Sequence, residues 1–145
     1  MGKISRVSIF RVLDANLNRT TEGLRVCEEV IRFLLNDREL TAKFKEARHR
    51  ILKITGAAAR KKYIETRDSK ADVGRKSLRG ELKRSSSQDI FFANMQRVKE
   101  SVRVLEEFYK LIDIKAAVKL KRIRYQAYEI EKKAALKLPA ISDIR

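Results

Sequence analysis

The sequence has few of the residues that cross-link or interrupt a chain: one cysteine, one proline, five glycines and no tryptophan among 145 residues. The single cysteine, Cys27, has no partner for a disulfide within the chain, and no Cys/His cluster has the spacing of a structural zinc site. Glycine and proline are too scarce to supply the turns of β-hairpins, whereas the helix-favouring residues Ala, Leu, Glu, Lys and Arg are abundant. The composition therefore predicts an all-α protein.

Long apolar runs are also missing. No stretch approaches the roughly 18 residues that a membrane-spanning helix needs, and the first residues lack the apolar centre of a signal peptide. We therefore expect a soluble, cytoplasmic protein that makes no membrane contact. With 43% hydrophobic residues the chain lies outside the disordered class, and its length fits a single domain.

Apolar residues recur at helical spacing in four segments. They predict a helix over about residues 8–35, a second that begins after the N-cap Asp37 and ends near residue 64, and two more between about residues 88 and 138. Ser86-x-x-Asp89 is a capping box for the third helix, and Pro139 stops the fourth. We therefore expect one helical domain with a hairpin over residues 8–64, a long loop over 65–87 and a second hairpin over 88–138.

The chain contains an internal repeat. Residues 15–29 (ANLNRTTEGLRVCEE) align without gaps with residues 93–107 (ANMQRVKESVRVLEE), and eight of the fifteen positions are identical. Most of the identical residues are polar, whereas several apolar positions differ, which is the reverse of what packing alone would preserve. The repeat predicts two duplicated αα-hairpins related by a pseudo-twofold axis, which close into a four-helix bundle.

Polar residues form the same stripe on both repeated helices. At about 100° per residue, Asn18, Glu22, Arg25 and Glu29 lie on one face, and their counterparts on the third helix do the same. Asn16, Arg19, Asn94 and Arg97 fall on or beside the apolar face, where a polar group needs a partner. The stripes fit either a solvated face with ordinary ion pairs or a buried polar network or ligand site.

The predicted loop is basic and contains Gly74-Arg75-Lys76-Ser77, but it lacks the first glycine and the preceding strand of a phosphate-binding P-loop. Such a loop is either a cradle for anions or a solvated connector. Cys27 lies on the apolar arc of its helix, which predicts a packed, inert thiol.

Three segments of the chain resemble a small helical family of monofunctional hydroxymethylpyrimidine phosphate kinases. They are RVLDANLNRTTEGLRVCEEVIRFLL, RDSKADVG and ANMQRVKESVRVLEEFYKL, and the resemblance extends from about Arg11 to Glu131. Members of the family occur alone or fused ahead of thiamine-phosphate synthase. Val102, where Leu is commoner, and Lys99-Glu100-Ser101, where Gln-Glu-Ala is usual, depart from the family pattern without removing a charged signature residue.

The resemblance implies ATP-dependent phosphorylation of 4-amino-5-hydroxymethyl-2-methylpyrimidine phosphate to its diphosphate in thiamine biosynthesis, with ATP and Mg²⁺ as cofactors. Phosphoryl transfer depends mainly on positioning and charge neutralisation, which suits a site rich in Arg and carboxylates. Our hypothesis assigns catalytic roles to Arg19, Glu22, Arg25, Arg97, Glu100 and Arg103. It assigns substrate or phosphate binding to Asn16, Asn18, Arg67, Arg84 and Asn94, and metal binding to Asp72 and Glu22.

Two other classes of function remain open at this point. A noncatalytic helical subunit that binds a phosphorylated ligand or thiamine-phosphate synthase fits the same residues. The net charge of +16 also suits a nucleic-acid-binding protein, but no helix-turn-helix signature and no alternation of aromatic and basic residues supports it. Residues 43–84 carry 15 basic and five acidic side chains, a distribution that would draw phosphate-bearing small molecules toward the first polar stripe. We also expect a homo-oligomer.

Overall fold

A computed structural model describes residues 4–77 and 79–138. All regular structure in these two ranges is helical, which confirms the all-α class. The α-helices are α1 (Arg6–Glu29), α2 (Arg38–Thr55), α3 (Ala57–Glu65), α4 (Ser87–Tyr109) and α5 (Ile114–Lys137), with the π-helix η1 (Val30–Leu35) and the short 3-10 helix η2 (Arg79–Leu82).

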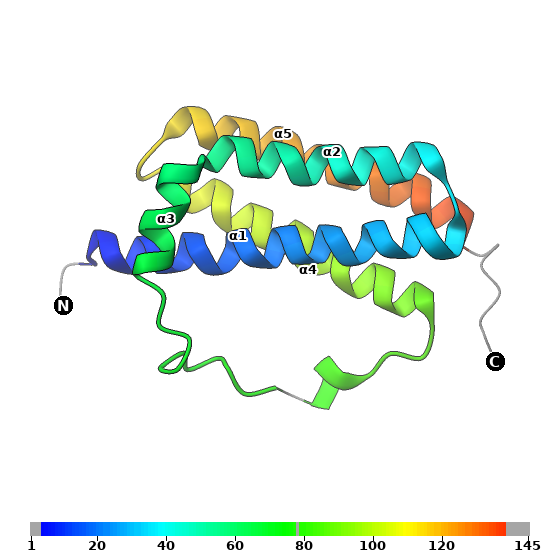
Figure 1. Cartoon of the computed structure of the whole chain (residues 1–145), viewed down its shortest axis with the longest axis horizontal. Helices are drawn as coiled ribbons and strands as arrows, with labels where there is room; N and C mark the ends of the chain where they lie inside the picture. The colour runs from blue at the N-terminus through cyan, green and yellow to red at the C-terminus, as the bar shows by residue number, and fades with distance from the viewer. Residues whose placement is uncertain (1–3, 78, 139–145) are drawn as a thin grey trace.

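The four long helices surround one core. Helix α1 packs against α4 and α2, and α5 packs against the same two helices from the other side (Figure 1). Fully buried side chains such as Leu24, Phe44, Phe91 and Ile123 fill the space between them. In Figure 1 the segment that joins α3 to α4 curves away from the helices and returns at the start of α4. Its first residues, Arg67, Asp68, Ser69 and Asp72, line a pocket together with α1.

The expected second helix is two helices, so the described chain has five α-helices rather than four. Gly56, with φ of 71° and ψ of 152°, ends α2 and precedes α3. A positive φ is a conformation that glycine adopts without the steric cost that a Cβ brings. The turn at Gly56 sends α3 away from the axis of α2 and against α1 (Figure 1). In this position α3 forms one wall of a pocket on α1.

The helix ends agree with the predicted caps. The Asp37 carboxylate accepts a hydrogen bond from the Leu40 amide at 2.9 Å, and the Ser86 hydroxyl accepts one from the Asp89 amide at 3.1 Å. Two boundaries differ in detail: the first helix changes from α to π geometry at Val30, and the expected loop contains the short helix η2. Pro139, the expected stop of the last helix, lies outside the described residues.

Helices α1 and α4 approach each other closely at two neighbouring points. A Cβ on Gly23 would lie 2.8 Å from Val98 Cγ2, so only glycine fits there without a shift. One turn earlier, the buried hydroxyls of Thr20 and Ser101 form a hydrogen bond of 2.7 Å. In the alignment of the repeat, Gly23 corresponds to Ser101, and Val98 corresponds to Thr20. The contact of Gly23 with Val98 and the contact of Ser101 with Thr20 are therefore equivalent positions in the two copies.

Each repeat buries one glutamate and surrounds it with arginines. Glu28 accepts a hydrogen bond from Arg48 Nε on α2 at 3.1 Å, and Arg25 lies 3.5 Å from its other oxygen. Glu106 repeats the pattern with Arg124 on α5 at 2.8 Å and Arg103 at 3.2 Å. Both glutamates are buried. Arg25 and Arg103 also form exposed ion pairs, with Glu29 and Glu107 respectively. The polar stripes thus contain both arrangements considered from the sequence: solvated ion pairs and buried networks.

Candidate functional site

A pocket of about 460 Å³ lies between α1 and the start of the segment that follows α3. We call it the α1–loop pocket. Its α1 residues are Ser8, Arg11, Val12, Asp14, Ala15, Asn16, Asn18 and Arg19, and its loop residues are Arg67, Asp68, Ser69 and Asp72. The volume is within the range of small-molecule sites, about 300–1,000 Å³.

The α1–loop pocket depends on an ion pair between residues far apart in the chain. Arg67 donates from Nε to Asp14 Oδ2 at 2.6 Å and from Nη2 to Asp14 Oδ1 at 2.8 Å. The side chain of Asp14 is 8% exposed and that of Arg67 is 43% exposed. Hydrogen bonding to Asp14 raises the pKa of Arg67 further above its ordinary value, so the guanidinium stays charged. The pair fastens the loop to α1 and leaves the remaining N–H donors of Arg67 for other partners.

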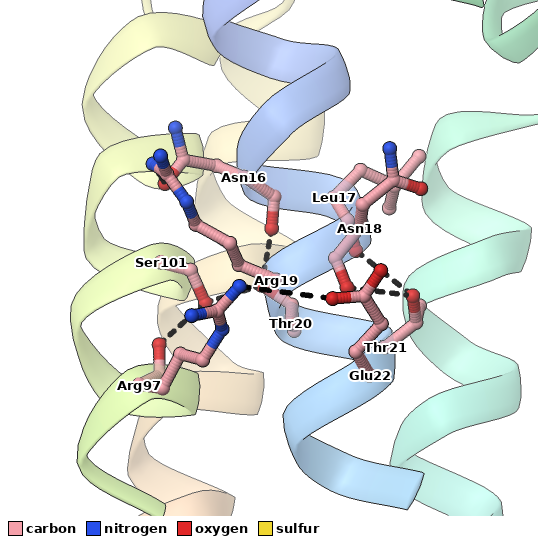
Figure 2. A network of polar contacts seen from close by, with 9 residues as sticks. All are labelled: Asn16, Leu17, Asn18, Arg19, Thr20, Thr21, Glu22, Arg97 and Ser101. Atoms are coloured by element: carbon pink, nitrogen blue, oxygen red, sulfur yellow. Dashed lines mark hydrogen bonds and ion pairs between the residues drawn. The ribbon is translucent and has the colours of Figure 1, made fainter. Parts of the chain in front are cut away.

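Asn16 and Arg19 form a second polar element of the pocket on α1 (Figure 2). Asn16 is buried and donates from Nδ2 to the Val12 carbonyl at 2.9 Å, which fixes the orientation of its amide. Arg19 Nη1 donates to Asn16 Oδ1 at 3.4 Å, a long hydrogen bond that holds the guanidinium only weakly. Asn16 is therefore a rigid polar group at the wall, and Arg19 is a charge that can turn toward an anion.

Arg19 and its repeat counterpart Arg97 have different partners. Arg97, on α4, lies 3.7 Å from Glu22 on α1, and Figure 2 shows the two side chains meeting between the helices. The corresponding pair would join Arg19 to Glu100, but Glu100 accepts a hydrogen bond from Gln96 at 2.9 Å and Arg19 turns to Asn16. The repeated residues thus depart from symmetry where the pocket lies, beside Arg19.

The structure brings together five of the predicted site residues, all of which line the α1–loop pocket: Asn16, Asn18, Arg19, Arg67 and Asp72. Glu22 and Arg97 pair one turn along α1 from Asn18 and are absent from the lining.

The remaining predicted residues lie elsewhere. Arg25 and Arg103 pair with glutamates on their own helices. Asn94 donates to the Ile90 carbonyl, Arg84 donates to the Lys83 carbonyl in the segment before α4, and Glu100 bonds to Gln96. The catalytic and binding roles of these residues stay predictions.

A second pocket, of about 650 Å³, also borders the Asp14–Arg67 pair. We call it the α1–α3 pocket because α1, α2 and α3 form its walls. It is lined by Asp14, Leu17, Asn18, Thr21, Arg48, Leu52, Ala57, Arg60, Lys61, Ile64, Glu65 and Arg67. Asp14, Asn18 and Arg67 therefore belong to both pockets.

The described residues contain no group of three or more His, Cys, Asp or Glu side chains placed to hold a metal ion. Mg²⁺ is commonly bound by one or two carboxylates together with substrate phosphates, and it does not need such a group. Asp68 and Asp72, both in the lining of the α1–loop pocket, fit that manner of binding. Asp72 Oδ1 accepts a hydrogen bond from the Gly74 amide at 2.8 Å, which orients its carboxylate.

Sequence reasoning missed Asp14 and Arg11 as residues of the site. Asp14 follows the buried Leu13 on the apolar side of α1, and a carboxylate there needs a cationic partner. That signal was present in the sequence, but it does not identify Arg67 as the partner. The expectation for Cys27 is confirmed: it is fully buried, and burial raises the pKa of its thiol, so it is not a ready nucleophile.

The fold and the pockets define a class: a small all-α protein with a polar pocket on α1 that is lined by arginine and aspartate side chains. No helix within residues 4–77 and 79–138 is long and apolar enough to cross a membrane. Residues 11–133 match the ThiD2 family, and the chain belongs to that family.

Curated relatives of the chain are named thiamine-phosphate synthase. The protein from Rhodopirellula baltica is 35% identical over 136 residues, which cover 93% of this chain and 36% of that protein. The protein from Nostoc punctiforme is 39% identical over 124 residues, 85% of this chain and 34% of its own length. The protein from Synechocystis is 39% identical over 132 residues, 90% of this chain and 37% of its own length. The chain thus spans about a third of the length of these relatives. No solved structure matches the chain.

Proposed function

We propose that this chain acts in thiamine biosynthesis as a kinase that converts 4-amino-5-hydroxymethyl-2-methylpyrimidine phosphate to its diphosphate with ATP. Membership of the ThiD2 family and the names of the relatives support the pathway. The observation that carries the reaction class is the α1–loop pocket, whose lining combines the three arginines Arg11, Arg19 and Arg67 with the three carboxylates of Asp14, Asp68 and Asp72.

The chemistry suits these residues. The accepting group is a phosphate monoester whose second pKa is about 6, so at neutral pH an ionised oxygen is available without a strong base. That oxygen forms a bond to the γ-phosphorus of ATP, the bond from the γ-phosphorus to its bridging oxygen breaks, and ADP leaves with the electron pair. Arg19 and Arg67 neutralise the charge on the phosphate oxygens, and Asn16 orients the pyrimidine or a phosphate.

Asp72, with Asp68, would hold Mg²⁺ together with the phosphates, and the ion supplies further charge neutralisation when bound. Glu22 lies one turn along α1 from Asn18, outside the pocket lining, and pairs with Arg97. In our proposal it positions charge at the pocket's edge. Arg25 and Arg103 act structurally in this proposal, because they surround the buried carboxylates of Glu28 and Glu106.

We also propose that the two long hairpins, α1–α2 and α4–α5, are copies of one αα-hairpin that close into a four-helix bundle. The matching Arg–Glu networks and the exchanged contacts between α1 and α4 support this interpretation. The proposed site then lies in one copy only, where α3 and the loop cover α1.

A second candidate function is a noncatalytic module that binds a phosphorylated ligand within, or beside, a thiamine-phosphate synthase. The specific observation in its favour is that the curated relatives carry that name and that the chain matches about a third of their length. This candidate keeps the α1–loop pocket as a binding site and assigns it no transfer of phosphate.

The test measures diphosphate formation by purified protein supplied with ATP, Mg²⁺ and the pyrimidine monophosphate. We expect Arg19→Ala and Asp72→Asn each to reduce kcat/KM by about 100-fold or more, since each removes a charge that acts on the transferring group. The control is Lys119→Ala, which removes one exposed positive charge from α5, a helix that contributes to neither pocket lining. Tight binding of the monophosphate with no consumption of ATP would support the second candidate instead.

A further inference from the structure

The α1–α3 pocket is larger than the α1–loop pocket and is not used by the acceptor in the proposed reaction. Its walls include Leu17, Leu52, Ala57 and Ile64, and Ile64 is 52% exposed although it is a large apolar side chain. Concave sites with apolar walls and a few polar groups are typical of small-molecule binding. Asn18 and Thr21 provide polar groups among these apolar walls.

The same pocket also carries a net positive charge. Its lining contains the cations Arg48, Arg60, Lys61 and Arg67 and the two carboxylates of Asp14 and Glu65. Asp14 neutralises Arg67, and the buried Glu28 neutralises Arg48. Arg60 and Lys61 then stand against Glu65 alone, so the remaining charge of the lining is positive. A ligand that fits both properties has an apolar part and an anionic part.

The two pockets meet at Arg67. Only two hydrogen bonds, both to Asp14, occupy its guanidinium in the described structure, and the group borders both cavities. Ligands in the two pockets would thus bring their anionic ends to the same guanidinium. An anchored arginine between two phosphates is a suitable arrangement for transfer between them.

We propose that the α1–α3 pocket binds the nucleoside triphosphate, with the base between Leu17, Leu52 and Ile64 and the phosphates directed past Arg67 toward the acceptor in the α1–loop pocket. The inference rests on the proposed function for the identity of the two substrates. It adds an assignment that the reaction alone does not give: which cavity holds which substrate.

The two assignments are separable by side chains that fill one pocket only. Ala57→Trp places a large side chain in the α1–α3 pocket from an exposed position, and Ala58→Trp, at the next exposed position of the same helix and outside the lining, is its matched control. Ile64→Glu is a second variant, which adds a negative charge to the pocket without entering the core. Ala15→Phe fills the α1–loop pocket instead.

The experiment measures the Kd of a non-hydrolysable ATP analogue and, separately, of the pyrimidine monophosphate by titration calorimetry, after thermal unfolding has shown that each variant folds. We expect Ala57→Trp and Ile64→Glu to raise the Kd of the analogue by about tenfold or more and to change that of the monophosphate by less than about twofold. Ala15→Phe should show the opposite pattern, and Ala58→Trp should bind both ligands as the unmodified chain does.

The inference is overturned if Ala57→Trp and Ile64→Glu bind the analogue normally, or if Ala15→Phe weakens analogue binding as much as they do. The proposed function is judged by a separate measurement, the formation of diphosphate by the unmodified chain. An unmodified chain that binds the analogue in the expected pattern but forms no diphosphate would contradict the kinase proposal and leave the pocket assignment standing. If the unmodified chain does not bind the analogue at all, both proposals fail.

Discussion

Truncation of Arg67 to alanine removes the side chain that joins the loop to α1 and borders both pockets. Asp14 would keep its buried position but lose two charge-assisted hydrogen bonds, of 2.6 and 2.8 Å. Breaking a fully buried ion pair from one side costs about 3–5 kcal/mol. Because the Arg67 side chain is 43% exposed, water can enter and solvate the carboxylate in part. We therefore expect the free energy of unfolding to fall by about 1–3 kcal/mol.

Urea unfolding followed by circular dichroism at neutral pH measures this change, and a double-mutant cycle assigns it to the pair. Asp14→Asn removes the charge that Arg67→Ala leaves buried, so the double variant should recover part of the lost stability. We expect a coupling energy of about 1 kcal/mol or more. A loss of less than about 0.5 kcal/mol for Arg67→Ala, with additive effects in the cycle, would refute the reasoning that this contact fastens the loop.

Two further predictions concern stability alone. Gly23→Ala gains about 1 kcal/mol of helix propensity but places a Cβ 2.8 Å from Val98 Cγ2, and since overpacking costs about 1–3 kcal/mol we expect a net loss in urea unfolding. Gly80→Ala is the control, because a Cβ at Gly80 would have no atom within 4 Å beyond its own residue and its two chain neighbours, and it should be neutral or stabilising. Equal effects of the two substitutions on stability would contradict the close approach of α1 and α4. Asp37→Ala should cost about 1 kcal/mol at neutral pH, because the Leu40 amide and then Lys137 hold the pKa of Asp37 below its ordinary value of 3.8 and the carboxylate caps α2. Because the pKa of Asp37 is lower in the folded than in the unfolded protein, its carboxylate stabilises the fold at a pH above the unfolded pKa, and this stabilisation is lost as the pH falls through the folded pKa. The difference in unfolding free energy between the unmodified protein and Asp37→Ala should therefore shrink toward about pH 2. A difference that stays constant from neutral pH down to that pH would contradict the assignment.

Local sequence signals were sufficient for most helix ends. Asp37 and Ser86 are caps whose side chains reach an amide three residues later, and that geometry depends only on residues close in sequence. The i, i+4 spacing also identified Arg25 with Glu29 as a possible ion pair, although the sequence left a buried network or a ligand site open for the same stripe. These features could be read from the sequence because their partners lie within one or two turns.

Contacts between distant residues could not be predicted in the same way. The break at Gly56 was missed because apolar spacing continues on both sides of it, and a single glycine inside a helical pattern is often tolerated. Arg67 was expected in the site, but its partner Asp14 lies 53 residues earlier, and only the path of α3 brings them together. Asp72 reaches the α1–loop pocket through that same path. The sequence therefore supplied candidate residues, whereas the turn at Gly56 decides which of them lie in the same pocket.

The most direct test of the proposed kinase is phosphorus NMR of the purified chain with ATP, Mg²⁺ and the pyrimidine monophosphate. We predict that the signals of the monophosphate and of the γ-phosphate decline together while the pyrimidine diphosphate and ADP appear in equal amounts. A folded chain that binds the monophosphate but leaves ATP unchanged and produces no diphosphate would contradict it.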